Sequence, residues 1–478
     1  MRKFYLITFL LFIVVGVFSQ PGNYWSMASN TESSILAGAV VGGGSGITSI
    51  YYNPAGISEL DDNKIALSAS LFHLNLSNYN NALANDHKNR YLDYQVQPNF
   101  FSFVYHPVSI PKLSFQIAVF SRGQSLTKLY DNYTAPINEI ITNKKVDYSV
   151  NYSYENRYRD TWFGIGSSYI LNDRWTIGTS LLFSDKVFLY NENTSVDLIP
   201  IDDTLTKVSK YLYVDRQDLY VVSFIGKIGA HFKTKRWSLG INISLPSVRI
   251  YGEGYHHREV SMIRIMTKDG LQPDFVDKET NFHLVSNFKE PLSISFGSVR
   301  SNEEKGLFIY FSTELFFPID DYKTIDNSKI TFLFDDDYEP GSSFLTYEYG
   351  ANAVLNAAFG IKKILSKSVS VMAGFKTDFS SYKIKDFNRE HNYGQYIRAY
   401  TDLYHLTSGV IFDYKRANVL FGVEYTFGYR KNQYQFRNFD YPGVYDTKKY
   451  YALQQYPEPI MNYMYNGLGI YFGLSFDF

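Results

Sequence analysis

The sequence of 478 residues predicts an all-β fold, a transmembrane antiparallel β-barrel, preceded by a compact N-terminal segment. Three features carry this prediction. The N-terminus has an export signal, yet no later apolar run is long enough for a membrane-spanning helix. Apolar and polar residues alternate over many segments of about ten residues, the length of a transmembrane strand. The connections between these segments alternate between short and long, as they do between the two rims of an outer-membrane barrel.

Residues 1–20 have the pattern of a secretory signal peptide. Arg2 and Lys3 supply positive charge, Phe4–Phe18 is apolar, and Ser19–Gln20 precedes a polar stretch. The alternative is a membrane anchor, but an apolar run of about 15 residues is shorter than the roughly 20 that a spanning helix needs. The chain has no cysteine, which excludes a lipoprotein anchor and disulfides. Because lipid accepts only helices and closed barrels, the exported chain is expected to be a barrel of the bacterial outer membrane or a soluble protein.

Charge and aromatic content narrow the class of protein further. Lys and Arg number 46 against 47 Asp and Glu, so the sequence lacks the basic excess of a nucleic-acid-binding surface. Aromatic residues make up 18% of the chain, with 43 Tyr and 38 Phe. These residues favour pleated strands and gather at both membrane interfaces of transmembrane barrels. Composition therefore argues against nucleic-acid binding and fits a membrane barrel, although a soluble β-sandwich can be Tyr-rich too.

The alternation of residues locates the strands. In Trp237–Leu245 the odd positions are large and apolar while the even positions are small or polar, and Val419–Gly428 repeats this pattern. Many opposite-face residues are Gly, Ser or Thr, as expected where a lumen must hold a plug or a ligand. The last strand ends on Phe478, which resembles the signal read by the barrel-assembly machinery. The pattern predicts about 14 strands. They lie near 64–76, 97–107, 112–121, 155–171, 174–192, 215–232, 236–250, 288–300, 305–317, 347–364, 367–378, 403–414, 416–430 and 465–478.

The connections fall into two groups. Tight turns are predicted at 172–173, 233–235, 366–367 and 415–416. Long, polar, Tyr-rich loops are predicted at 77–96, 123–160, 191–217, 251–287, 318–346 and 382–404. Short turns on one rim and long loops on the other are typical of outer-membrane barrels.

Residues 33–57, SSILAGAVVGGGSGITSIYYNPAGI, do not alternate like the strands. The glycines in this segment permit close backbone approach and positive φ angles. An Asn-Pro pair commonly opens a turn, because proline disfavours helical angles at the residue before it. We expect a compact, irregular segment inside the lumen, where it is shielded from lipid. Its predicted functional residues are Asn53, Pro54 and Ala55 as the turn motif, with Gly42, Gly43, Gly44 and Gly46 as the packing glycines.

This segment resembles the N-terminal hatch of the FadL-type long-chain fatty-acid transporters, whose hallmark is an Asn-Pro-Ala motif after a Gly/Ala-rich run. Residues 161–183 and 225–247 are also similar to strands of that family. The resemblance implies a 14-stranded barrel at 63–478 behind a hatch at 21–62. It also implies passive uptake of hydrophobic small molecules, such as long-chain fatty acids. A related family of secretion and gliding proteins carries the same motif, so a structural or docking barrel is the alternative.

The resemblance also implies a mechanism. Family members pass a ligand from an outer groove to a lumen pocket, move the hatch, and release the ligand through a lateral gap at a kinked third strand. Gly123 is the nearest candidate for that kink. Lys227 shares a face with Ser223, Gly229 and His231 and could hold a ligand carboxylate; the alternative is a lumen lysine paired with Glu424.

Other constellations predict no further chemistry. His256-His257, with Glu253 and Glu259 nearby, is interpreted as surface polarity in a loop rather than a metal site. The run Asp335–Asp337, followed by Glu339, is interpreted as solvated charge that could bridge to lipopolysaccharide through a cation. No catalytic residue, metal site or cofactor is expected, and the protein is not expected to be an enzyme. Expected partners are hydrophobic solutes, outer-membrane lipid and lipopolysaccharide, and the assembly machinery, with the chain as a monomer.

Overall fold

The computed structural model describes residues 22–25, 32–60, 64–139, 141, 143–201, 207–326, 345–383, 398–414, 417–447 and 451–477. The predicted signal peptide at 1–20, the Asp335–Asp337 run with Glu339, and Phe478 lie outside the described residues. None of the described helices is long and apolar enough to cross a membrane.

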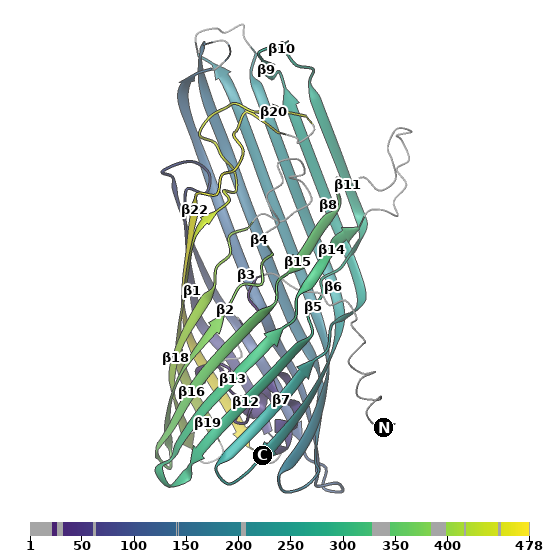
Figure 1. Ribbon diagram of the computed structural model, residues 1–478, viewed down its shortest axis with the longest axis vertical. Coiled ribbons are helices and arrows are strands. Elements are labelled where there is room, and N and C mark those ends of the chain that lie inside the picture. Colours follow the sequence, from purple (N-terminus) through teal and green to yellow (C-terminus); the bar gives the residue numbers. More distant parts are fainter. Residues whose placement is uncertain are drawn as a thin grey trace, which may run out of the picture.

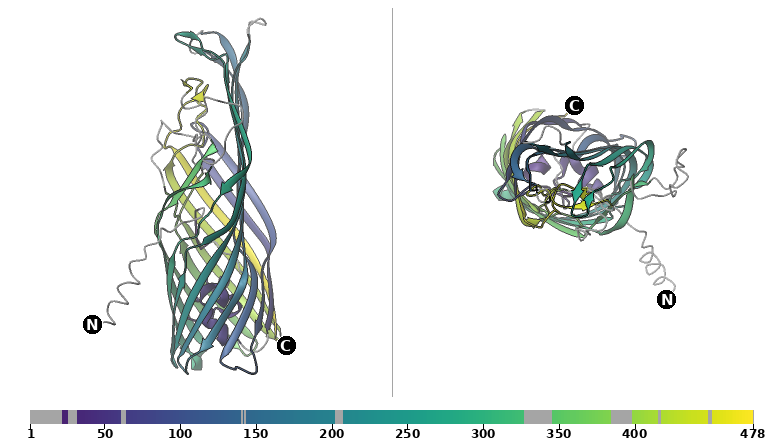
Figure 2. Two further views of the ribbon diagram at one scale, coloured as in Figure 1. Left: turned by 90° about the vertical axis from the view of Figure 1, so that its right-hand side faces the viewer. Right: turned by 90° about the horizontal axis from the view of Figure 1, so that it is seen from above.

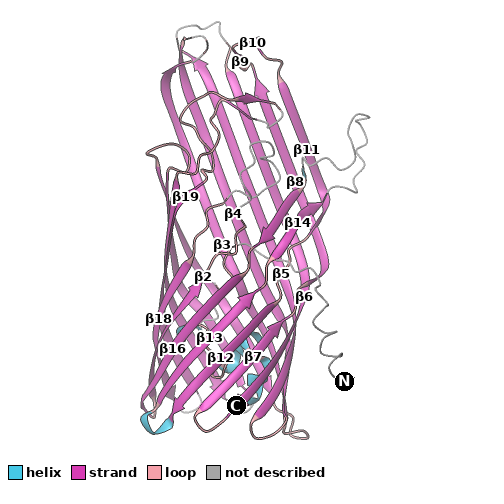
Figure 3. Ribbon diagram, viewed as in Figure 1, coloured by secondary structure: helices cyan, strands magenta, loops and turns pink. Residues whose placement is uncertain are grey.

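The described chain is almost entirely strand (Figure 3). Its helical elements are short: α2 (Glu32–Ile35), η1 (Gly46–Thr48), α3 (Ser49–Tyr52), η2 (Pro54–Glu59) and η3 (Glu303–Lys305). The first half of the strands comprises β1 (Lys64–Asn80), β2 (Lys88–Tyr105), β3 (Leu113–Asn138), β4 (Lys145–Ile170), β5 (Trp175–Pro200), β6 (Ser209–Lys233), β7 (Trp237–Ser244), β8 (Val248–Ile263), β9 (Met266–Thr267), β10 (Gly270–Leu271) and β11 (Phe275–Ser286). The second half comprises β12 (Ser293–Asn302), β13 (Leu307–Phe316), β14 (Ile319–Asp326), β15 (Tyr347–Ala351), β16 (Val354–Ser366), β17 (Val369–Asp378), β18 (Leu403–Tyr414), β19 (Ala417–Gln433), β20 (Tyr445–Asp446), β21 (Tyr451–Ala452) and β22 (Met461–Asp477).

The large sheet is antiparallel and curls around on itself (Figure 1). The first strand, β1, pairs with β2 on one side and with the last strand, β22, on the other. From β2 the pairings run through β3, β4, β5, β6, β7, β12, β13, β16, β17, β18 and β19 to β22. The tight turns predicted at 172–173, 233–235 and 366–367 all connect paired neighbours, as expected.

The lower part of this sheet is apolar on its outer face. On β5, Trp175, Ile177 and Leu181 are exposed, whereas Ser180, on the opposite face, is fully buried. The same alternation holds on β4, where Phe163 and Ile165 are exposed. In a soluble sandwich the apolar face would point inward. A sheet with apolar residues outside and small polar residues inside has the polarity of a transmembrane barrel.

Four strands are much longer than the sequence predicted. β3, β4 and β5 have 26 residues each and β6 has 25, and together with β8 and β11 they form a tall wall at the upper end of the sheet (Figure 2). The loops predicted at 123–160, 191–217 and 251–287 were therefore wrong over most of their length. Their residues alternate with period two, but the polar residues face outward and the tyrosines face inward. The sequence analysis interpreted this polar, Tyr-rich composition as that of loops.

Two predicted strands are interrupted instead. The segment 236–250 is divided between β7 and β8 at Pro246, and 347–364 is divided between β15 and β16 at Asn352–Ala353. Pro246 has no backbone N–H to donate to a ladder, which explains the first break. Below the breaks β7 pairs with β12, and above them β8 pairs with β11. The part of the sheet above the breaks consequently has edge strands that the lower part does not have.

Candidate functional site

The N-terminal segment, Glu32–Leu60, lies inside the lower part of the curled sheet (Figures 1 and 2). It consists of α2, η1, α3 and η2, joined by turns. Ile35, Ile50 and Ile57 are fully buried and pack against inward-facing residues of the strands. This segment is the one that the sequence predicted to be compact and irregular, and its residues form the candidate site.

Asn53 fastens the segment to itself and to the wall of strands. Its side chain is fully buried. The Nδ2 group donates to the Val41 carbonyl at 2.9 Å and to the Ala230 carbonyl of β6 at 3.2 Å. The Oδ1 atom accepts from the Ala55 N–H at 3.2 Å, which caps η2, and Pro54 occupies the first position of that helix, where its missing N–H costs nothing. One amide thus uses three hydrogen bonds to join two turns of the segment to a strand.

A row of inward-facing glycines on the strands makes room for this docking. A Cβ atom at Gly229 would overlap the Asn53 side chain, one at Gly178 would overlap the Pro54 backbone, and one at Gly240 would overlap the Val41 carbonyl. On nine strands, a Cβ atom added to an inward-facing glycine would lie 3.0 Å or less from an atom of the N-terminal segment. We call these nine residues the glycine belt: Gly166, Gly178, Gly229, Gly240, Gly297, Gly360, Gly374, Gly409 and Gly422.

The predicted packing glycines of the segment serve two purposes. A Cβ on Gly42 would meet the backbone of Gly297 and Ser298 at 2.5 Å, so this position needs space. Gly44 and Gly46 have φ angles of +73° and +51°, which other residues rarely adopt. Gly43 combines both constraints, since its φ is +139° and a Cβ would lie 3.2 Å from Ser238.

Lys227 faces the interior from β6, on the same face as Ser223, Gly229 and His231. Its Nζ donates to the Tyr51 carbonyl at 2.9 Å and lies 4.2 Å from the centre of the Tyr51 ring. The predicted alternative partner, Glu424, instead contacts His405 at 2.5 Å and accepts a hydrogen bond from Tyr471. In this structure Lys227 therefore binds the N-terminal segment.

The third strand, β3, is irregular next to Gly123, the residue that the sequence analysis named as the candidate for a kink. The pairing of β3 with β4 shifts register between Ser121 and Gly123, which makes Arg122 a bulge residue. The pairing of β3 with β2 ends at the Phe100–Phe120 pair. Above it, β2 pairs only with β1 and β3 only with β4 among the described strands. We call this unpaired stretch the β2–β3 seam; its top is bridged by a contact of 3.1 Å between His87 Nδ1 and Asp131 Oδ2.

Arg122 was missed by the sequence analysis. Its side chain is 7% exposed, and its guanidinium donates to the Tyr24 carbonyl and lies 5.4 Å from the Tyr51 ring. It therefore connects the bulge of β3 to the N-terminal residues. A bulge is not visible in residue spacing, so no pattern in the sequence distinguished this arginine from a solvated one.

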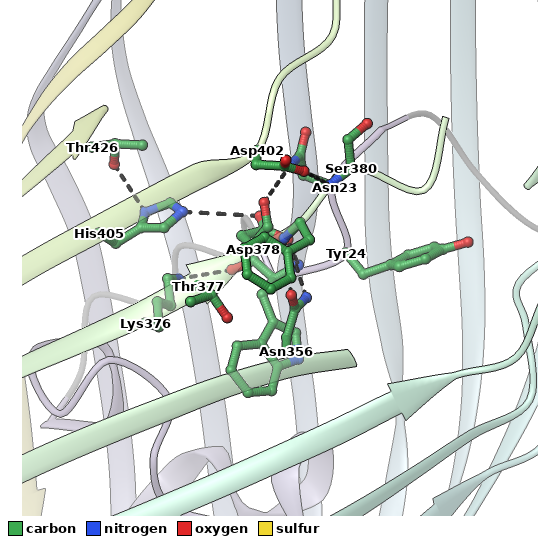
Figure 4. Close-up of polar contacts among 12 residues, drawn as sticks. Asn23, Tyr24, Asn356, Lys376, Thr377, Asp378, Ser380, Asp402, His405 and Thr426 are labelled. Carbon is green, nitrogen blue, oxygen red and sulfur yellow. Dashed lines mark hydrogen bonds and ion pairs between the residues drawn. The ribbon is translucent and has the colours of Figure 1, made fainter. Parts of the chain in front are cut away.

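On the far side of the lumen, a polar cluster holds the described residues Gly22–Trp25, which we call the strap (Figure 4). The buried Asp378 of β17 accepts a hydrogen bond from the Trp25 N–H at 2.8 Å, and Lys376 donates to the Trp25 carbonyl at 2.7 Å. Asn23 donates to the carbonyls of Asp378 and Thr401 at 2.5 and 3.2 Å. The strap thus spans the lumen between β17 and Arg122.

The histidine pair was placed wrongly by the sequence. His256 and His257 lie on β8, not in a loop, and His256 is fully buried. It contacts Asp215 at 3.0 Å, and Arg258 donates to the same carboxylate at 2.8 and 3.1 Å. Burial alone would raise the pKa of Asp215, but the charge of Arg258 and the contact with His256 hold it well below its ordinary value. No group of metal-ligating side chains occurs among the described residues.

Comparison with known proteins places the fold. No protein-family model matches the sequence, and no curated protein matches it. Solved structures do match. The Pseudomonas putida toluene transporter TodX has a TM-score of 0.52 at 13% identity over 97% of this chain and 100% of its own. A Pseudomonas aeruginosa FadL homologue has 0.52 at 11% identity over 97% and 100%. The Ralstonia pickettii toluene transporter TbuX has 0.50 at 10% identity over 93% and 98%.

These matches define the class of fold. The chain shares the all-β fold of these toluene transporters and of the FadL homologue, and the likeness extends over nearly its whole length. The resemblance inferred from Asn53-Pro54-Ala55 is therefore confirmed at the level of the fold.

Proposed function

We propose that the protein is an outer-membrane channel for the passive uptake of hydrophobic small molecules, long-chain fatty acids or similar compounds. One observation carries the proposal: a buried N-terminal segment is docked on the glycine belt inside a circuit of strands whose lower outer face is apolar. The circuit from β1 to β22 is then a closed barrel of about 14 strands. The signal peptide occupies 1–20, the hatch 21–62 and the barrel 63–478.

In this proposal the N-terminal segment is the hatch. It closes the lumen by direct backbone contact with the belt, which leaves no space for a solute between them. Its attachments to the strands are separate polar contacts, among them the hydrogen bonds of Asn53 to Ala230, of Lys227 to Tyr51, and of the strap to Asp378. Individual hydrogen bonds contribute about 0.5–1.5 kcal/mol each, so a bound solute can offset several of them. Lys227 and Arg122 would then be released to meet a carboxylate.

Release would occur at the β2–β3 seam. A solute that left sideways would enter the apolar part of the membrane without crossing a polar lumen. The bulge at Arg122 and the end of pairing at Phe100–Phe120 directly follow the exposed, alternating residues Phe115, Ile117 and Val119 of β3. A buried methylene contributes about 0.8 kcal/mol, so the lipid is a favourable destination for an acyl chain or an aromatic ring.

The structural neighbours are described as transporters of toluene and as a FadL homologue, which supports hydrophobic compounds as the cargo. We also propose an outer-membrane location with lipid and lipopolysaccharide around the barrel, assembly through Phe478, a monomeric state, and no enzymatic activity.

Replacing Asn53 with Ala tests the hatch. We expect uptake of labelled oleate to fall several-fold while the amount of folded barrel stays unchanged, because the three Asn53 hydrogen bonds position the hatch. Asn302→Ala is the matched control: Asn302 also caps a short helix, η3, by accepting from the Lys305 N–H at 3.2 Å, but it lies outside the lumen site. A docking barrel of a secretion machine would instead keep its uptake unchanged and lose a co-purifying partner.

A further inference from the structure

Short turns fix the register of some strand pairs of the large sheet but not of others. Within the hairpins β16–β17 and β18–β19 only two residues separate the paired ends, because Ser366 pairs with Val369 and Tyr414 with Ala417. A connection this short fixes the register. By contrast, β17 and β18 are joined by residues 379–402, a connection long enough to allow several registers. The register between these two hairpins must therefore be set by contacts other than a turn.

The outer face of the sheet does not distinguish these registers. A slip by one residue would turn every side chain of a strand to the wrong face, so the smallest slip that keeps the polarity of the strand is two residues. On β17 such a slip puts Ala373 or Phe375 in the place of Val371, and all three of these apolar residues are exposed. The apolar outer face is therefore compatible both with the native register and with slipped ones.

The inner face does distinguish the registers, because each strand of the glycine belt carries one inward residue without a side chain. On β17 the inward neighbours of Gly374 are Met372 and Lys376, both of which are buried. A slip of two residues would place one of these long side chains where the N-terminal segment leaves no room even for a Cβ atom. The docked segment therefore accepts only the register that aligns the glycine with it.

Ile35 of the N-terminal segment contacts both hairpins at once. Its side chain is fully buried. Its carbonyl oxygen would lie 2.8 Å from a Cβ atom on Gly374 of β17, and it accepts a hydrogen bond from Thr407 of β18 at 2.6 Å. Its Cδ1 atom would overlap a Cβ atom on Gly409 of β18 and would lie 2.8 Å from one on Gly422 of β19. One residue of the segment thus aligns β17 with the hairpin that follows it.

Val41 makes the same kind of connection at a second place. β7 and β12 belong to different hairpins, and residues 245–292 separate them along the chain. The Val41 carbonyl would overlap a Cβ atom on Gly240 of β7, and the Val41 Cβ atom would lie 2.8 Å from one on Gly297 of β12. The Val41 N–H also donates to Ser312 of β13 at 3.1 Å. The segment therefore bridges hairpins at two places where no short turn joins the paired strands.

We propose that the N-terminal segment is also an internal template, which selects the register between hairpins while the sheet forms around it. The segment precedes every strand in the chain, so each hairpin can dock on it as that hairpin joins the sheet. A hairpin that arrives two residues out of register presents a side chain in place of its belt glycine and cannot dock. This function concerns assembly, and it holds whether or not the protein takes up any solute.

Disulfide trapping measures the register between β17 and β18, because the chain has no cysteine of its own. In the native register Ala373 pairs with Ser408, whereas a slip of two residues brings it opposite Val410 or Leu406, depending on the direction. Opposed Cα atoms lie about 4.5–5.5 Å apart, within reach of a disulfide, and diagonal neighbours lie about 7–8 Å apart, beyond that reach. Ala373→Cys is therefore combined with Ser408→Cys to report the native register, and with Val410→Cys or Leu406→Cys to report the slipped ones.

Shortening Ile35 tests the template. With the wild-type segment we expect only the native disulfide in the folded, heat-modifiable protein. Ile35→Ala should raise the yield of a slipped disulfide several-fold, because space opens beside the belt glycines of β18 and β19. Ile35→Val removes only the Cδ1 atom and should raise the yield less; since it folds at little cost, it decides the test if Ile35→Ala does not fold.

Ile57→Ala is the matched control. Ile57 is as fully buried as Ile35, but it lies against Gly166 of β4, whose partner β5 follows after a short turn. We therefore expect no slipped disulfide between β17 and β18 in this variant. Folded Ile35 variants that form only the native disulfide would overturn the proposal. A slipped disulfide at the same yield in Ile57→Ala would overturn it too, because general loosening of the segment would then explain the slip.

Discussion

Replacing Gly229 with Ala is the sharpest perturbation of the proposed hatch. The added methyl group would overlap the Asn53 side chain and lie 2.9 Å from Pro54 Cδ. Overpacking of this kind costs about 1–3 kcal/mol. If Asn53 moves, its two Nδ2 hydrogen bonds are lost at about 0.5–1.5 kcal/mol each. The docked state should thus lose about 2–6 kcal/mol, which shifts the docking equilibrium by a factor of roughly 30 to 10⁴.

Single-channel conductance in a planar bilayer measures this shift directly. The wild type should conduct ions weakly, because the hatch fills the lumen, and Gly229→Ala should show frequent or permanent open levels. Gly226→Ala is the control on the same strand, since its Cβ would meet only the flexible end of Leu245 at 3.2 Å. If Gly229→Ala conducts like the wild type and is folded, the hatch does not close the lumen and the reasoning fails.

Three further predictions concern assembly and the wall. Deleting Phe478 should lower the amount of folded, heat-modifiable barrel several-fold; normal membrane levels would contradict the role of the terminal strand. Asp215→Asn should lower the free energy of unfolding by about 3–5 kcal/mol in a denaturation assay, because Arg258 stays buried without its counter-charge. The control in the same assay is Asp218→Asn, which breaks an exposed pair with Arg216 on the same strand and should cost about 0–1 kcal/mol. Burial lowers the pKa of His256, so the unfolded chain takes up a proton first as pH falls through about 6.5, and the native wall should lose up to about 1.4 kcal/mol per pH unit below that value; hydrogen-exchange protection factors of β8 that are equal at pH 7.5 and 5.5, after correction for the intrinsic exchange rate at each pH, would refute this.

The strands of the lower sheet could be predicted from the sequence because period-two alternation is a local property. The spacing of Trp175, Ile177 and Leu181 alone predicts that they lie on one face of the strand, which is the outward face. The alternation also marked Gly240 and Gly422 as small inward residues, although only the structure shows that Gly240 faces Val41 and Gly422 faces Ile35. The motif Asn53-Pro54-Ala55 gave the turn, but its partner Ala230 is 177 positions away.

The remainder depended on long-range contacts. The wall was missed because the upper part of the sheet reverses the polarity of the lower part, so that Tyr148 and Tyr152 point inward and polar residues outward. His256 was predicted to be a polar loop residue at the surface, because no local pattern shows that it contacts Asp215 in the interior, where Arg258 binds the same carboxylate. Arg122 could not be found because a bulge changes the direction of one side chain without changing the residue pattern.

Uptake by cells tests the central claim most directly. Entry of labelled oleate and labelled toluene is measured in a strain that lacks the protein and has no paralogue, and in the same strain with the wild-type chain. The account predicts that both solutes enter slowly without the protein and that the wild-type chain restores entry several-fold. Entry of both solutes at the wild-type rate in the strain without the protein would contradict it.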